Sequence, residues 1–160
     1  MLPVYDKPLI YYPLSNLILA GCKEILIISS PKSLGELKNQ LGDGSRFGIS
    51  LSYVEQSSPE GIPSAINLAK SFSENEDIWV SLGDNLIFGS RIKELYEDVN
   101  SSKKATIFIK HVGSIYGFGS AKIEKEKITH LEEKPKTKSS GWAVTGLYKF
   151  PNSVFELIPT

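Results

Sequence analysis

Short hydrophobic runs alternate with amphipathic segments through the first hundred residues, and this alternation limits the possible folds more than any other feature. The run at residues 25–28 is continuous and apolar, as in a strand buried on both faces. A second apolar run follows at 78–82, and segments with helical spacing lie around both runs. This alternation predicts an α/β fold of right-handed βαβ units, with a mostly parallel central sheet flanked by helices.

The pattern changes after residue 105, where mostly strands joined by short polar turns are expected. These added strands should be antiparallel and should extend or fold over the first sheet.

In the first half, Asp6 is the expected N-cap of the first helix and Pro8 lies in its first turn, while Pro13 predicts a kink or a short first turn. No repeat or linker is present, so residues 1–160 are expected to form a single domain. The predicted helices cover residues 8–20, 34–41, 63–72 and 90–100, and the predicted strands cover 25–28, 49–53, 78–82, 105–112, 120–124, 128–133 and 144–150.

Composition limits the class of protein. The 160 residues include 18 Lys plus Arg and 18 Asp plus Glu, so neither nucleic acid nor an anionic membrane is an expected partner. Cys22 is the only cysteine, which excludes an intramolecular disulfide, and we interpret it and the two histidines, His111 and His130, as structural or incidental. No apolar stretch reaches the ~18 residues of a membrane span. The first charge is the acidic Asp6 rather than a basic leader, so we expect a cytoplasmic protein.

The strongest local signal is the run Leu82-Gly83-Asp84-Asn85, in which a hydrophobic strand ends in a glycine and a carboxylate. In open α/β sheets, ligands bind at the carboxyl ends of strands, and a carboxylate there suits Mg²⁺, which prefers oxygen ligands. The alternative is that Asp84 and Asn85 cap the turn after the strand.

A second candidate is the polar loop from Gln56 to Gly61, between a predicted strand and a predicted helix. A glutamine amide both donates and accepts hydrogen bonds, which suits the edge of a nucleobase, and Gly61 allows a flat ligand close to the backbone. The alternative is an ordinary connecting loop. No glycine-rich phosphate-binding motif occurs in the chain.

The second half adds Glu132-Glu133-Lys134, where a glutamate and a lysine are suited to sugar hydroxyls and a phosphate, respectively. An exposed strand end with mixed charge is the alternative. Gly146 interrupts a predicted strand, which indicates a bulge or a close approach by a ligand or by backbone. Tyr116 and Gly117 form a similar aromatic and glycine pair, for which a turn is the alternative.

Taken in order, these motifs resemble the sugar-1-phosphate nucleotidyltransferases, and among them the enzymes that use dTTP and glucose 1-phosphate. The likeness covers essentially the whole chain. The segments that carry it are residues 2–14, 25–29, 41–45, 56–61, 82–85, 132–135 and 143–148.

The resemblance implies a Rossmann-like nucleotidyltransferase fold that converts dTTP and α-D-glucose 1-phosphate into dTDP-glucose and pyrophosphate, with Mg²⁺ as cofactor. Gln56 and Gly61 would bind the thymine base, and Asp84 would bind the metal and thereby the nucleotide. Glu133 would bind glucose hydroxyls, and Lys134 would hold the sugar phosphate as the catalytic lysine. The remaining substrate-binding positions that the resemblance implies are Tyr116, Gly117, Val144, Gly146 and Tyr148.

Three departures from the family pattern shape the expectations. The family begins with a strand and a glycine-rich loop before the segment that matches Leu2-Pro3, and it carries a second metal-binding Asp beyond the match to Thr160. Ile62-Pro63-Ser64 replaces the usual Leu-Ala-Gln. We therefore expect a truncated domain whose sheet is opened, with unpaired strand edges and little or no activity by itself. The alternatives are a non-catalytic sugar-nucleotide-binding or interaction module, or a related transferase that uses UTP or CTP. The resemblance also suggests a homo-oligomer and a place in the synthesis of deoxysugars, such as dTDP-rhamnose, for surface polysaccharides.

Overall fold

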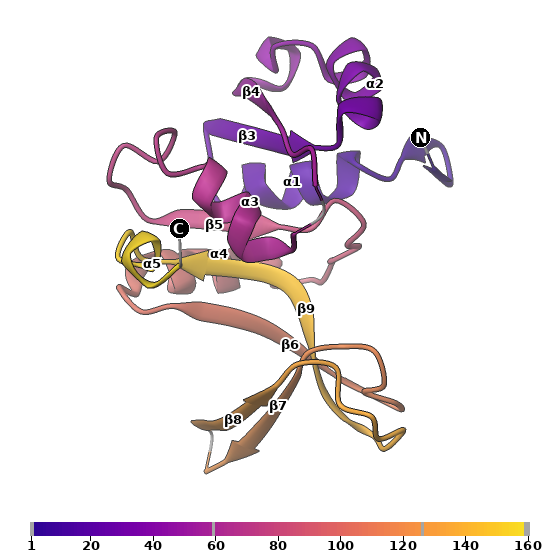
Figure 1. Cartoon of the computed structure of the whole chain (residues 1–160), viewed down its shortest axis with the longest axis vertical. Helices are drawn as coiled ribbons and strands as arrows, with labels where there is room; N and C mark the ends of the chain where they lie inside the picture. Colours follow the sequence, from indigo (N-terminus) through magenta and orange to yellow (C-terminus); the bar gives the residue numbers. More distant parts are fainter. Residues whose placement is uncertain (1, 59, 126, 159–160) are drawn as a thin grey trace.

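The structure, a computed structural model, describes residues 2–58, 60–125 and 127–158; Met1, Pro59, Glu126, Pro159 and Thr160 lie outside the described residues. Helices and strands alternate through the first half and strands dominate the second, so the predicted α/β class is confirmed (Figure 1). In chain order the elements are β1 (Pro3–Val4), β2 (Lys7–Pro8), α1 (Tyr11–Leu19), β3 (Glu24–Ser29), α2 (Pro31–Leu41), a short 3-10 helix (Ser45–Phe47), β4 (Ser50–Glu55), α3 (Ile62–Leu68), β5 (Ile78–Ser81), α4 (Ile92–Ser101), β6 (Thr106–Val112), β7 (Ser120–Glu124), β8 (Lys127–Glu132), β9 (Gly141–Phe150) and α5 (Val154–Leu157).

The strands form one parallel pair and one larger antiparallel sheet. β3 pairs with β4 in parallel over six residues of each strand. β9 pairs with β5, β6 and β7, all antiparallel, and β8 pairs with β7. The parallel part is therefore smaller than expected among the described residues, because β5 pairs with β9 and has no hydrogen-bonded contact with β3. The predicted opening of the sheet is confirmed at this position, between β3 and β5.

The first helix begins later than the sequence suggested. Pro8 lies in β2, which pairs with β1, and the turn between them contains Tyr5 at a left-handed φ of 56°. The prediction that Asp6 is the N-cap of the first helix is therefore wrong, and Ile10 occupies that position instead. Pro13 is the third residue of α1, where its missing N–H has no partner inside the helix, so the expected kink has no cause.

Other boundaries differ by a few residues. α2 begins at Pro31, three residues earlier than predicted, with Ser30 at the N-cap position and proline in the first turn. α3 ends at Leu68 rather than near residue 72. β9 begins at Gly141, and it is long enough to pair with several other strands.

Two clusters of buried side chains hold these layers together. One joins α1, β3, α2 and β4, and its members are Leu14, Ile25, Ile27, Leu37, Leu41, Ile49 and Leu51. The other is centred on Tyr96 and Leu147 beside Ala20, with Trp79 and Phe108 packed against it. The Trp79 and Tyr96 rings meet edge to face, with their centroids 5.3 Å apart.

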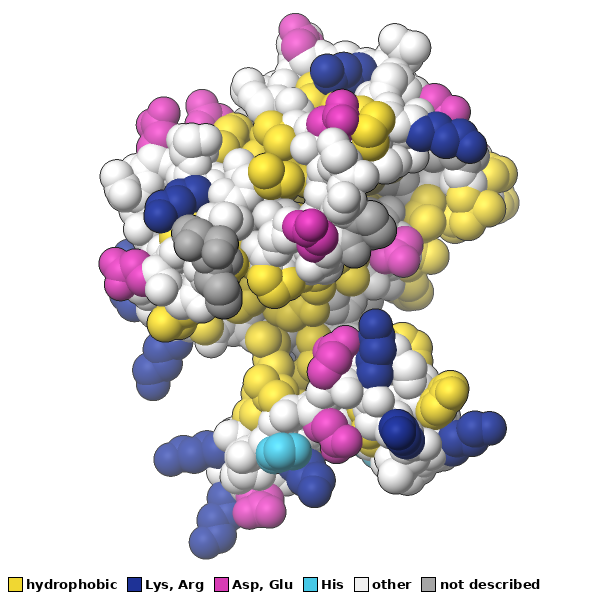
Figure 2. Space-filling model, viewed as in Figure 1, with side chains coloured by type: hydrophobic (Ala, Val, Ile, Leu, Met, Phe, Trp, Pro, Cys, Tyr) yellow, Lys and Arg dark blue, Asp and Glu magenta, His cyan; other side chains and the backbone are white. Residues whose placement is uncertain are grey.

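The β7–β8 hairpin projects from the main body, and Figure 2 shows Lys and Arg side chains gathered on this projection and hydrophobic side chains at its base. Among the described residues, no helix is long and apolar enough to cross a membrane. The single-domain organisation of residues 1–160 stays a prediction.

Candidate active site

Asp84 lies in an exposed turn just after β5, at the carboxyl end of that strand. The Asn85 backbone N–H closes this turn by donating to the Leu82 carbonyl oxygen at 3.4 Å. The Asp84 carboxylate makes no hydrogen bond or ion pair among those found for the described residues, so it does not stabilise the turn in this way. A carboxylate free of turn contacts at a strand end is well suited to a hard cation.

Asn85 connects this turn to β9. A Cβ atom on Gly146 would lie 2.6 Å from Asn85 Nδ2 and 2.6 Å from Leu82 Cδ1, so only glycine fits. Gly146 has a left-handed φ of 75°, and the β6–β9 register shifts opposite it, between Ile107 and Ile109. The predicted bulge at Gly146 is confirmed, and the groups that come close to this glycine are side chains rather than the ligand or backbone of the alternative prediction. The Nδ2 atom of Asn85 is buried and has no hydrogen-bond partner among the described residues.

Gln56 and Gly61 lie together at the start of α3. Gln56 Nε2 donates to Ser64 Oγ at 3.3 Å, and Ser64 Oγ donates to Glu60 Oε2 at 3.1 Å. Gly61 occupies the N-cap position of α3 with a φ of 86°. Glycine adopts this positive φ without steric cost, so the backbone conformation by itself accounts for a glycine here. Pro63 is the second residue of α3, so its missing N–H removes no hydrogen bond from the helix.

Glu133 and Val144 lie beside Gly119, Lys134 lies beside Glu133, and Tyr148 shares β9 with Val144; we call these five residues the sugar-side cluster. A Cβ atom on Gly119 would lie 3.4 Å from Glu133 Oε2 and 3.5 Å from Val144 Cβ. Lys134 Nζ lies 3.7 Å from Glu133 Oε1, with both side chains largely exposed. Burial raises the pKa of Tyr148, and the charge of Glu133 raises it further.

Lys134 has a left-handed φ of 46°, which turns the chain just after β8. This turn explains why Glu133 and Lys134 lie together, although consecutive residues of a regular strand face opposite ways. The pair is therefore a local structure that an extended strand end would not form.

Tyr116 and Gly117 are not brought into the sugar-side cluster by any contact found among the described residues. Tyr116 is 57% exposed, and Lys138 Nζ lies over its ring at 5.6 Å. Gly117 has φ of 85°, and the Phe118 backbone N–H donates to the Ile115 carbonyl oxygen at 3.1 Å. These two positions form a turn, as the alternative interpretation expected, and their role in the sugar pocket stays a prediction.

The turn that contains Asp84 connects the three parts of the site. Gln56 and Gly61 line the same cavity as Leu82 and Gly83, which directly precede Asp84. The same turn also contacts Gly146, which lies between the cluster members Val144 and Tyr148 on β9. The candidate metal ligand thus belongs to a turn that contacts both the cavity of the candidate base-binding residues and the strand of the sugar-side cluster.

Asp84 is the acidic side chain that this turn contributes. No group of three or more His, Cys, Asp or Glu side chains suited to a metal is found in the described part of the chain. A site with one protein carboxylate still fits Mg²⁺, which usually keeps several waters and binds through one or two carboxylates plus substrate phosphates. Burial raises the pKa of the Cys22 thiol to about 11, which fits its structural interpretation.

Two supporting features were not recognised in the sequence. Asn16 of α1 is buried, donates from Nδ2 to the Ile87 carbonyl oxygen at 3.0 Å and accepts from the Tyr96 hydroxyl at 2.9 Å. This contact fixes the loop after β5 that carries Asp84. The other feature is Gly119, for which the Gly-Phe-Gly run at residues 117–119 was an available signal.

Comparisons with known proteins identify the family to which the chain belongs. Residues 1–159 match the family described as nucleotidyl transferase. The chain is 42% identical over 158 residues to a glucose-1-phosphate thymidylyltransferase of Neisseria meningitidis and 39% identical to one of Mycolicibacterium smegmatis. In both cases 98% of this chain is covered but only 55% of the relative, so the chain spans about half the length of these proteins.

Solved structures show the same fold. A Bacillus anthracis protein, described as a candidate glucose-1-phosphate thymidylyltransferase and crystallised with sucrose, superposes with a TM-score of 0.88 at 34% identity. The match covers 97% of this chain and 63% of that one. A UDP-glucose pyrophosphorylase in complex with UDP-glucose superposes with a TM-score of 0.80 at 26% identity, covering 98% of this chain and 69% of the other.

Proposed function

Because this chain belongs to the nucleotidyl transferase family, we propose that it carries the base-binding and sugar-binding residues of a glucose-1-phosphate thymidylyltransferase. The observation that carries this proposal is the set of contacts that connects Gln56 and Gly61, through the turn of Asp84, to the β9 strand of the sugar-side cluster. That order matches the order of base, phosphates and sugar in a nucleoside diphosphate sugar. The similarity to named thymidylyltransferases at 42% and 39% identity supports the choice of dTTP and glucose 1-phosphate.

In the proposed reaction, a phosphate oxygen of glucose 1-phosphate attacks the α-phosphorus of dTTP in line. One P–O bond forms, and the bond to the β-phosphate breaks to release pyrophosphate. No side chain acts as a nucleophile, so these residues contribute by binding, orientation and charge. Lys134 holds the attacking phosphate by its ammonium group, and Glu133 accepts hydrogen bonds from sugar hydroxyls.

Gln56 offers an amide edge to the base, and Gly61 keeps that approach free of a side chain. Asp84 is the residue that would hold Mg²⁺, and the ion, when bound, offsets negative charge on the triphosphate. Val144, Gly146 and Tyr148 shape the floor of the sugar site from β9. Tyr116 and Gly117 would contact the sugar from the turn that precedes β7.

The proposal is tested by measuring binding and turnover separately. Calorimetry with glucose 1-phosphate should give measurable affinity that Glu133→Gln and Lys134→Met each weaken by about tenfold, the scale of one charge-assisted hydrogen bond. Asp98→Asn, an exposed change on α4, is the control and should leave the affinity unchanged. Equal binding by the two cluster variants and the unchanged chain would contradict the assignment.

Turnover is followed by pyrophosphate release from dTTP and glucose 1-phosphate in the presence of Mg²⁺. We expect the 160-residue chain to be a poor catalyst beside an N-terminally extended version that carries a strand and a glycine-rich loop. Turnover by this chain near that of the extended version would overturn the expectation. Asp84→Asn in the extended version should reduce kcat by about a hundredfold or more, since it removes the carboxylate that would hold Mg²⁺ at the phosphates.

Nucleotide choice is a second question, because the UDP-glucose pyrophosphorylase match has a TM-score of 0.80. Parallel assays with dTTP, UTP and CTP decide it, and we expect dTTP to be preferred. Binding of sugar nucleotide without turnover in both versions would instead favour a non-catalytic binding module. A cytoplasmic homo-oligomer that supplies dTDP-glucose for deoxysugars such as dTDP-rhamnose completes the proposal.

A further inference from the structure

Ser64 joins two other side chains at the start of α3. It is the third residue of that helix, and its Oγ accepts a hydrogen bond from Gln56 Nε2 at 3.3 Å and donates one to Glu60 Oε2 at 3.1 Å. We call this row of two hydrogen bonds the Ser64 relay. Ser64 is one of the positions at which the chain departs from the family pattern, so the relay belongs to this chain and is not implied by the resemblance.

Glu60 sets the direction of both hydrogen bonds in the relay. A carboxylate accepts hydrogen bonds and has no hydrogen to donate, so the hydroxyl hydrogen of Ser64 is committed to Glu60 Oε2. A serine hydroxyl carries one hydrogen, and toward Gln56 it therefore offers a lone pair only. The Gln56 amide turns its NH₂ group to Ser64, because its carbonyl oxygen would find no donor there.

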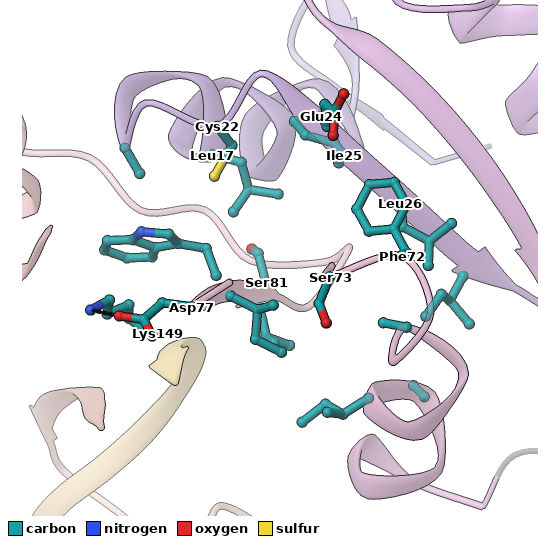
Figure 3. Close-up of a pocket in the computed structure, with 18 of the residues that line it drawn as sticks. Leu17, Cys22, Glu24, Ile25, Leu26, Phe72, Ser73, Asp77, Ser81 and Lys149 are labelled. Atoms are coloured by element: carbon teal, nitrogen blue, oxygen red, sulfur yellow. Dashed lines mark hydrogen bonds and ion pairs between the residues drawn. The ribbon is translucent and has the colours of Figure 1, made fainter. Parts of the chain in front are cut away.

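Gln56 lines a large cavity in the gap between β3 and β5. This cavity has a volume of about 1080 Å³, and Gln56 and Gly61 are both among its lining residues. Figure 3 shows part of the apolar lining, with Leu17, Leu26 and Phe72 around the open space. In a mostly apolar site a few polar groups fix the orientation of a ligand, so the direction in which the Gln56 amide points is important.

The relay leaves Oε1 as the free end of the Gln56 amide. Among the described residues no hydrogen bond to Oε1 is found, while Nε2 is held by Ser64. Neither Ser64 nor Glu60 is among the lining residues of the cavity, so the bonded end of the amide is tied to residues outside it. A ligand in the cavity therefore meets an amide of fixed orientation that offers it an acceptor.

We propose that Ser64 and Glu60 are positioning residues that hold Gln56 Oε1 toward the base, and that the site thereby selects a pyrimidine with an N–H donor at N3. Thymine and uracil carry this N–H, whereas cytosine carries a lone pair at N3. The inference rests on the proposed function, because it concerns the base of the proposed nucleotide substrate.

The selection follows from which groups face each other at one position of the base. Thymine or uracil donates from N3 to Gln56 Oε1, but cytosine in the same place sets two acceptors against each other. Polar groups left unpaired in a site of this kind are costly, so cytosine is rejected. The methyl group that distinguishes thymine from uracil is bonded to C5, away from N3, so the relay does not separate dTTP from UTP.

Calorimetry on the full 160-residue chain tests the proposal by comparing dUTP with dCTP in the presence of Mg²⁺. The two nucleotides share their sugar and phosphates and differ only in the base edge, so the ratio of their Kd values measures recognition of that edge. We expect the unchanged chain to bind dUTP at least about tenfold more tightly than dCTP, the scale of one hydrogen bond gained or lost.

Ser64→Ala frees the Gln56 amide to turn, and alanine is well suited to a helix. Affinity for dUTP should change by less than about threefold, but dCTP should bind more tightly, because Nε2 then donates to N3 of cytosine. The preference for dUTP should fall to about threefold or less. A variant that only damaged the fold would bind both nucleotides more weakly.

Three further variants separate the relay from other effects. Glu60→Gln provides an amide that donates to Ser64, which releases the hydroxyl to donate to Gln56 Oε1, so the preference should fall as in Ser64→Ala. Ser64→Thr keeps the hydroxyl and should keep the preference. Ser33→Ala is the matched control, since Ser33 is the third residue of α2 and also follows a proline in the first turn, and it should leave the ratio unchanged.

Nuclear magnetic resonance without nucleotide tests the relay by itself. In the ¹⁵N-labelled chain, the side-chain amide signals of Gln56 should shift in Ser64→Ala and Glu60→Gln and stay in place in Ser33→Ala. These spectra also verify that each variant is folded.

The outcomes distinguish this inference from the proposed function. A preference for dUTP that Ser64→Ala retains, or an equal loss of affinity for both nucleotides in that variant, would overturn the inference alone. Equal binding of dUTP and dCTP by the unchanged chain would do the same. Binding of neither nucleotide by the unchanged chain would contradict the proposed function, and the inference with it, even where the Gln56 signals show the relay.

Discussion

The β3–β4 pair and the antiparallel sheet around β9 are built from similarly apolar strands, yet they differ in how completely their edges are used. β9 has strand partners on both sides, and Leu147 at its centre is 1% exposed. β3 has a partner on one side and a cavity on the other. The comparison teaches that burial, and not hydrophobicity alone, decides what a side chain contributes to stability.

The largest expected difference is between two leucines, one in each region. Leu147→Ala should lower the free energy of unfolding by about 2–5 kcal/mol, because it leaves a hole in a packed core. Leu26→Ala, whose side chain already faces the cavity, should cost less than about 1 kcal/mol. Urea unfolding of both variants measures the difference, and similar losses would show that the gap is closed in solution.

The Asp77–Lys149 pair sharpens the comparison from the β9 side. Lys149 is 3% exposed, and its Nζ donates to Asp77 Oδ2 at 2.8 Å and to the Ser102 carbonyl oxygen. Asp77→Ala should cost about 3 kcal/mol, because it leaves a buried ammonium without its partner. Glu97→Ala, which breaks the exposed Lys93–Glu97 pair, is the control and should cost about 0.3–0.5 kcal/mol.

The Asp77–Lys149 pair also makes the stability of the fold depend on pH. The hydrogen bond from Lys149 lowers the pKa of Asp77 below its ordinary value of 3.8, so the fold favours the ionised carboxylate. The resulting stability is present above about pH 4 and is lost as pH falls through the lowered pKa. Chemical unfolding between pH 3 and pH 6 should show this loss in the unchanged chain and not in Asp77→Ala, whereas parallel curves would contradict it.

A smaller effect is expected where β9 meets the turn of Asp84. Gly146→Ala should cost about 1–3 kcal/mol, because a left-handed φ and contacts of 2.6 Å oppose a Cβ atom. Gly89→Ala, with no atom within 4 Å of its Cβ position, should change stability by less than about 0.5 kcal/mol. Thermal unfolding compares the two, and equal shifts would argue against the close approach of Asn85.

The smallest predicted effect probes the link between the two regions. Tyr96→Phe removes the hydroxyl that donates to Asn16 Oδ1 of α1 and should cost about 1 kcal/mol. Burial raises the pKa of Tyr96 to about 12, so its contribution is present below pH 10 and is lost as pH rises from 10 to 12. Ultraviolet titration of tyrosinate, compared between the chain and the variant, measures this ionisation; a normal pKa near 10 would contradict the burial.

Element positions were predictable where local patterns were strong. The alternating run at 120–124 and the apolar run before Gly83 gave strands with nearly correct limits. The start of α1 was missed because Asp6-Lys7-Pro8 fits a turn as well as a helix cap, and the left-handed Tyr5 selects the turn. Such a choice depends on the β1–β2 pairing, which local preference does not encode.

The candidate site was predictable in its parts more than in its assembly. A glycine and carboxylate at a strand end identified Asp84, and a glycine inside a strand identified the bulge at Gly146. The contact between Asn85 and Gly146 joins residues far apart in the chain, so no local pattern contained it. The same is true of Asn16, whose partners Ile87 and Tyr96 come from other elements.

The pairing of β5 with β9 also bears on the order in which the protein is made. A ribosome releases β5 well before residues Leu147 to Phe150, which are the first residues with which β5 pairs. β3 and β4, joined through α2, can meet soon after they emerge, because their pairing is more local. During synthesis β5 therefore waits longer than β3 or β4 for the strand with which it pairs. The speed at which the β9 region emerges governs how long the unpaired, aggregation-prone edges of β5 are exposed.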